Sequence, residues 1–127
     1  KDRGLSVILH DSTQEKASVT KAMAESFMTL ALPHKTEGFY LPGIEAMFYS
    51  KVAIVPYCVA NKEYFCKGAN MLVPHYTEES IKKAILSGLK RGTIENCFRE
   101  YIGKKIARQY SLHNERKTLS ACLRKYF

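Results

Sequence analysis

The sequence predicts an α/β fold: an open parallel sheet of about four strands with helices on both faces. Residues 26–32 (SFMTLAL) and 51–57 (KVAIVPY) are continuous apolar runs, typical of strands buried on both faces of a parallel sheet. Segments with helical periodicity alternate with these runs, which favours a sheet built with right-handed crossovers. The chain has 127 residues, of which 46% are hydrophobic, enough for one core. We therefore expect a single domain over residues 1–127.

Local signals define the first predicted strand and helix. Residues 6–10 (SVILH) form a short β-prone run and predict a strand. Ser12 and Glu15 have the spacing of a capping box, in which each side chain accepts a hydrogen bond from an unpaired amide at the helix start. A helix is therefore expected at about residues 13–25.

The middle of the chain continues the alternation. A helix is expected at about residues 43–50, between the two apolar runs. Residues 70–74 (NMLVP) predict a short edge strand that ends at Pro74, because proline cannot donate to a sheet. Thr77 has the side chain and position of an N-cap, and the helix that follows it should end near Gly92.

Two further helices are predicted, at about residues 94–109 and 111–127, and they carry most of the charge. The formal net charge of the chain is +8, and residues 88–127 hold ten Lys or Arg against three Glu, a difference of seven. Such a basic segment fits nucleic acid, an anionic membrane surface or an anionic substrate, and it fits a solvated helix face equally well. No sequence signature of a nucleic-acid-binding fold accompanies it, so nucleic acid is the least favoured of these partners.

The remaining composition predicts a cytoplasmic protein without a metal. No apolar run approaches the ~18 residues of a membrane span, and the first residues lack the pattern of a signal peptide. Peripheral association with the inner face of a membrane stays open. The four cysteines lack the spacing of a zinc site, and reduced thiols are expected, although Cys58 and Cys66 flank one loop in which they could pair.

The segment KTEGFYLPGIEAMFYSK, residues 35–51, carries the strongest functional signal. Glu37 lies in a predicted loop, and Glu45 lies just inside the predicted helix. Glycine at 38 and 43 lets backbone approach a ligand, and a helix N-terminus attracts phosphate. A carboxylate next to a phosphate is best explained if it accepts hydrogen bonds from hydroxyl groups, as a ribose diol provides. We therefore expect a sugar nucleotide in this loop, with Glu45 on the ribose.

This segment resembles a known family. EGFYLPGIEAM is similar to the EGFGLPxxEAM signature, with its E-x7-E spacing, of retaining GT-B glycosyltransferases, in their C-terminal nucleotide-sugar-binding domain. The likeness extends from AESFMTLALPHKTEGF through KVAIVPYCVANKEYFCKGANMLVP to ARQYSLHNERKTL, and covers about residues 6–120. It implies a Rossmann-like sheet that is part of the C-terminal half of a GT-B fold.

The resemblance also implies a reaction and a set of residues. A sugar would move from a nucleoside diphosphate sugar to an acceptor hydroxyl with retention of configuration, in polysaccharide or glycoconjugate biosynthesis, and no cofactor or metal is implied. The acceptor would be a saccharide or a lipid-linked glycan. Glu37 would be catalytic, close to the reacting carbon, and Glu45 would bind the ribose. The other residues implied in donor binding are Gly38, Phe39, Tyr40, Leu41, Pro42, Gly43, His34 and Lys35.

The chain departs from this family in two ways. Tyr40 replaces the second glycine of EGFG, and Ala60 stands where related loops often carry glycine. The first two strands of the domain and the acceptor domain have no counterpart, so the chain alone is expected to be an inactive fragment. The edge of the strand at 26–32 would then be covered by residues 7–10 or by a second copy. A nucleic-acid-binding α/β module and a non-catalytic nucleotide-binding scaffold remain alternatives.

Overall fold

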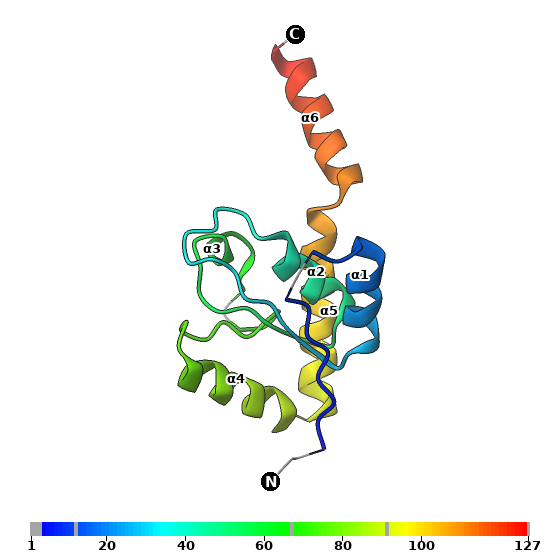
Figure 1. The fold of residues 1–127 in the computed structure, drawn as a ribbon. Helices are drawn as coiled ribbons and strands as arrows, with labels where there is room; N and C mark the ends of the chain where they lie inside the picture. The colour runs from blue at the N-terminus through cyan, green and yellow to red at the C-terminus, as the bar shows by residue number, and fades with distance from the viewer. Residues whose placement is uncertain (1–3, 12, 67, 91, 127) are drawn as a thin grey trace.

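The computed structural model describes residues 4–11, 13–66, 68–90 and 92–126, and forms a mixed α/β unit that is mostly helical (Figure 1). Two short parallel strands lie among helices, and the α/β class predicted from the sequence is confirmed. In chain order the elements are α1 (Lys16–Glu25), β1 (Met28–Leu30), α2 (Leu41–Tyr49), β2 (Val52–Ile54), α3 (Asn61–Tyr64), α4 (Glu78–Lys90), α5 (Thr93–Gln109) and α6 (Leu112–Tyr126).

The sheet is small and parallel, with β2 at its centre. Thr29 of β1 is in register with Ala53 of β2. On the other side of β2, the amide of Leu72 donates to the carbonyl of Ala53 at 2.9 Å, and the amide of Val55 donates to Leu72 at 2.9 Å. Residues 70–74, predicted as an edge strand, therefore lie parallel to β2 but contribute only an isolated bridge between Leu72 and Ile54.

Helices cover β2 on both faces, which explains its uninterrupted apolar sequence. On one face α4 approaches closely at Gly88, where an added Cβ would lie 2.6 Å from Met28 and 3.2 Å from Val52. On the other face lies the main core, drawn from α2, β2, α5 and the loops after the strands. Its buried members are Ala31, Ile44, Ala46, Met47, Ala53, Val55, Cys58, Ala60, Tyr64, Met71 and Ala107.

The strand predicted at residues 6–10 is not formed. These residues belong to no strand, and Val7 and Leu9 are 82% and 77% exposed. A strand is stable only when a neighbour pairs with its backbone, and within the described ranges no backbone hydrogen bond joins residues 4–11 to β1. The described residues therefore form fewer strands than the four predicted. Ser12 of the predicted capping box lies outside them, and Glu15 makes no side-chain cap bond.

The other predicted helices are present, with shifted ends. The hydroxyl oxygen of Thr77 accepts a hydrogen bond from the amide of Ser80 at 3.3 Å, so Thr77 caps α4 as predicted. Helix α2 begins at Leu41 rather than near Gly43, because Pro42 fits the first turn, where its missing amide is not needed. The short helix α3 was not predicted.

Helix α6 extends away from the rest of the molecule as a continuation beyond α5 (Figure 1), and no residue described in it is buried. In the part of the chain that the structure describes, no helix combines the length and apolar character needed to cross a membrane.

Candidate functional site

The loop between β1 and α2 lies at the carboxyl end of the parallel strands, where α/β sheets commonly bind ligands. A turn closes at its centre, since the amide of Glu37 donates to the carbonyl of His34 at 3.0 Å. The carbonyl of Glu37 in turn accepts from the amide of Ala60, at 2.9 Å, in the loop that follows β2. Glu37 is thus fixed by its backbone between the two strand ends, with a half-buried side chain.

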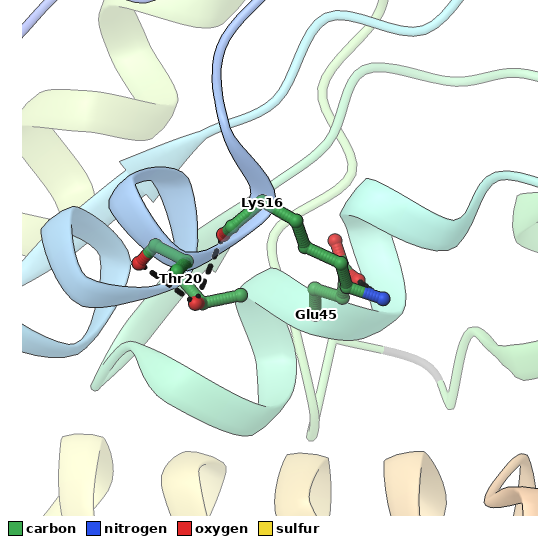
Figure 2. Close-up of polar contacts among 4 residues, drawn as sticks. Lys16, Thr20 and Glu45 are labelled. Carbon is green, nitrogen blue, oxygen red and sulfur yellow. Dashed lines mark hydrogen bonds and ion pairs between the residues drawn. The ribbon is translucent and has the colours of Figure 1, made fainter.

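Glu45 lies in the second turn of α2 and is already paired. The structure places no acidic residue in the first turn, because the helix starts earlier than the sequence indicated. The Glu45 carboxylate lies 3.4 Å from the ammonium of Lys16 at the start of α1, as Figure 2 shows. The side chain of Lys16 is 82% exposed and that of Glu45 is 25% exposed. An ion pair this exposed contributes only about 0–1 kcal/mol, so a ligand can displace the lysine at little cost.

The two glycines of the loop have different environments. Gly38 is exposed, and an added Cβ there would meet nothing within 4 Å. At Gly43 an added Cβ would lie 3.0 Å from the Tyr64 hydroxyl and 3.3 Å from the ring of Tyr40. The amide of Gly43 also donates to the carbonyl of Tyr40, at 3.1 Å. Glycine at 43 is therefore explained by internal packing against two tyrosines, and its amide is used within the turn.

Tyr40, the residue that replaces a glycine of the signature, turns its ring into the protein. The ring is half-buried against Gly43, and the helix that begins after it has no side-chain cap. Burial raises the pKa of Tyr40 to about 12, with smaller contributions from Tyr76, Cys58 and Glu37. Because the ring packs inward, tyrosine in place of glycine at position 40 leaves the exposed backbone at Gly38 accessible to a ligand.

The remaining loop residues are mostly at the surface. His34 is exposed, and its ring Nδ1 lies 2.8 Å from the Thr36 hydroxyl. The ammonium of Lys35 lies 5.9 Å from the centre of the Tyr76 ring. Leu41 is exposed and Pro42 is half-buried, both within the first turn of α2. His34 and Lys35 are therefore accessible to an anion beside this loop.

An aromatic contact joins the loop to the end of α5. The ring centres of Phe39 and Tyr110 are 5.7 Å apart, and those of Tyr64 and Tyr110 are 6.3 Å apart with the rings nearly perpendicular. Burial raises the pKa of Tyr110, and a hydrogen bond and the charge of Glu63 raise it further. Sequence reasoning missed Tyr110 and Tyr64, because no local pattern indicates which distant aromatic residues meet the loop.

A buried polar cluster holds the loop after β2 in place. The Asn61 side-chain oxygen accepts from the Cys58 thiol at 2.9 Å and from the Tyr64 hydroxyl at 3.2 Å. Its amide nitrogen donates to the carbonyls of Pro56, at 2.9 Å, and Val55, at 3.3 Å. The Tyr64 hydroxyl is also 3.4 Å from the carbonyl of Tyr40, which ties this cluster to the start of α2.

Neither the cysteines nor the potential metal ligands among the described residues form a second site. Cys58 is buried and Cys66 exposed, and both are free thiols, so the local pairing left open by the sequence does not occur. Among the described residues, no group of three His, Cys, Asp or Glu side chains gathers in a way that could hold a metal ion.

Comparison with known proteins adds no assignment. No protein-family model matches the chain, and no curated protein matches it at a significant level.

Proposed function

We propose that this chain is the donor-binding part of a retaining glycosyltransferase of the GT-B fold, acting on a nucleoside diphosphate sugar. One observation carries the proposal. The E-x7-E pair falls at the carboxyl end of a parallel β1–β2 pair, with Glu37 tied by its backbone to the loop after β2 and Glu45 on the helix that follows. This is the position at which open α/β sheets bind nucleotides.

The accessible groups suit the parts of such a donor. Glu45 can exchange Lys16 for the two ribose hydroxyls, because the ion pair is exposed and weak. The open backbone at Gly38 and the exposed side chains of His34 and Lys35 can meet the diphosphate. Glu37, between the strand ends, is then the carboxylate nearest the sugar.

In this arrangement the carboxylate of Glu37 stabilises the positive charge that develops on the sugar in an oxocarbenium-like transition state. The negative charge that develops on the leaving diphosphate is met by Lys35 and by exposed backbone amides of the loop. The acceptor, a saccharide or a lipid-linked glycan, approaches from outside the described residues. The chain alone is then expected to bind the donor without completing the transfer.

The proposal includes a larger sheet than the two strands observed. In this proposal, β1, β2 and the stretch at Leu72, which lie parallel to one another, form one side of a Rossmann-like sheet. The free edge of β1 is where the central strands of a complete donor domain would pair.

Titration of the chain with uridine and guanosine diphosphates, followed by calorimetry, tests the proposal. One of the two should bind, and Glu45→Ala should weaken it roughly 10- to 150-fold, equivalent to about 1.5–3 kcal/mol, because two charge-assisted hydrogen bonds are lost. Glu100→Ala is the matched control, since Glu100 is also paired with a lysine on a helix, and its side chain is 24% exposed. If neither diphosphate binds, or if both variants weaken binding equally, the assignment of the site is wrong. If a longer protein that contains this chain and an acceptor-binding part binds a diphosphate tightly but transfers no sugar, the non-catalytic scaffold is favoured.

A further inference from the structure

Helix α6 buries none of its described residues against the rest of the protein. Every residue described from Leu112 to Tyr126 is exposed or half-buried, and the helix extends beyond the core-forming elements (Figure 1). A surface helix normally buries an apolar face against its own protein. The apolar face of α6 therefore needs a partner outside the described residues.

The large apolar side chains of α6 lie in a stripe on one side of the helix, where Glu115 and Arg116 come between Leu112 and Leu119. Leu112, Leu119, Leu123 and Tyr126 follow one another at intervals of seven, four and three residues, which places them on one side of the helix. They are 69%, 58%, 49% and 74% exposed, respectively. A helix of this length is about 22 Å long, too short to span a bilayer but long enough to lie along its surface.

The rest of the helix is strongly basic. Within the described helix, Arg116, Lys117, Arg124 and Lys125 are opposed by a single acidic residue, Glu115. By helical spacing, Lys117, Arg124 and Lys125 lie on the side away from the stripe, while Arg116 lies at its border. A low average hydrophobicity, a leucine stripe and a lysine- and arginine-rich face are together typical of helices that lie in a membrane interface.

We propose that α6 is an anchor that binds in the plane of an anionic lipid surface, with its stripe inserted and its cations on the headgroups. Charge complementarity selects this partner: an anionic surface pairs with the cations and takes up the stripe, whereas a second copy packed stripe to stripe would leave the cations of both helices without an anionic partner. Nucleic acid would match the cations but would leave the stripe in water. The proposal does not depend on the nucleotide site and extends to any function that places the chain at a membrane.

The first test compares vesicles of phosphatidylcholine with vesicles that also contain phosphatidylglycerol, by co-sedimentation at low and high salt. The chain should bind the anionic vesicles at least about tenfold more strongly, and salt should weaken this binding. Lys117→Glu with Arg124→Glu should reduce binding by about tenfold or more. Lys51→Glu with Lys82→Glu is the matched control, because it changes net charge equally at exposed positions outside α6.

The second test addresses the stripe. Leu119→Ser with Leu123→Ser should reduce binding to anionic vesicles about tenfold, whereas Ile94→Ser with Phe98→Ser, at exposed positions of α5, should not. Thermal unfolding of all four variants should match the unmodified chain, because none of the changed side chains is buried.

Three results would overturn the proposal. One is equal loss of binding in a variant pair and its control. Another is tighter binding to a short DNA duplex than to anionic vesicles at the same salt concentration. The third is a dimer in light scattering that disappears with the Leu119 and Leu123 changes, which would assign the stripe to a second copy.

Discussion

The ammonium of Lys16 and the carboxylate of Glu45 form an ion pair at 3.4 Å that joins the start of α1 to the second turn of α2. The residue proposed to bind the ribose is therefore already paired in the free protein. The pair is exposed on the lysine side, so it is a contact that a ligand can replace.

Lys16→Ala should therefore leave the free energy of unfolding within about 0.5 kcal/mol of the unmodified value. Nucleotide affinity should stay the same or rise up to about fivefold, since the ligand no longer competes with the lysine. Calorimetric titration measures the affinity, and Lys21→Ala, which removes the other lysine of α1 paired with a glutamate, is the control. A large fall in affinity would instead make Lys16 a ligand-binding residue.

Glu37→Gln should affect turnover more than binding. The change keeps the shape of the side chain but removes the charge proposed to stabilise the developing cation, so kcat should fall at least about tenfold while donor affinity changes little. The measurement needs a protein that carries this chain together with an acceptor-binding part. A rise in KM at constant kcat would instead assign Glu37 to recognition of the ground-state sugar.

Asn61→Ala should destabilise the fold by about 2–4 kcal/mol, because it leaves buried hydrogen-bonding groups of Cys58, Pro56 and Val55 unsatisfied. Urea denaturation measures this loss. Asn114→Ala is the control: its side chain makes an exposed hydrogen bond to the carbonyl of Arg108, and removing it should cost less than about 1 kcal/mol. Equal losses in the two variants would show that burial of the Asn61 cluster is unimportant.

Tyr40 makes stability depend on alkaline pH. Its pKa is about 12 in the folded chain, because burial disfavours the phenolate, and the ordinary value is 10.0. The stabilisation linked to this shift is complete below pH 10 and is lost as pH rises from about 10 to 12, since the unfolded chain releases the proton first. Tyr40→Phe should therefore lose less stability than the unmodified chain over this range. Urea denaturation at each pH checks this, and identical pH curves would contradict the assignment.

The free edge of β1 should promote self-association of the isolated chain. The amide of Ala31 is bonded to Ile54, and because successive strand amides alternate in direction, those of Leu30 and Leu32 point away from β2. Four apolar residues near the N-terminus are also exposed: Leu5, Val7, Ile8 and Leu9. No backbone hydrogen bond among the described residues joins them to β1, so they do not pair with this edge as one sequence-based alternative expected. Sedimentation should show dimers, with hydrogen exchange at Leu30 and Leu32 nearly as slow as at Ala31. A monomer with fast exchange at both leucines would contradict this prediction.

Local patterns in the sequence were enough to predict several elements. The apolar runs at 26–32 and 51–57 contain β1 and β2, and Thr77 caps α4 as its side chain indicated. The helices expected at 94–109 and 111–127 are present within about a residue at each described end. Capping and helical periodicity involve residues a few positions apart, so they can be read without knowledge of the fold. The loop position of Glu37 follows from the same local signals.

Only the tertiary structure decided which distant residues meet. Residues 6–10 have strand-forming composition but form no strand, because a strand needs a backbone partner and none reaches them in the described chain. A glycine is required at 43 because the Tyr64 hydroxyl lies close to it. The ring of Phe39 contacts the ring of Tyr110, and the Glu45 carboxylate is paired with Lys16. Each of these contacts joins separate elements. Their geometry depends on how the helices pack on β2, which no short stretch of sequence specifies.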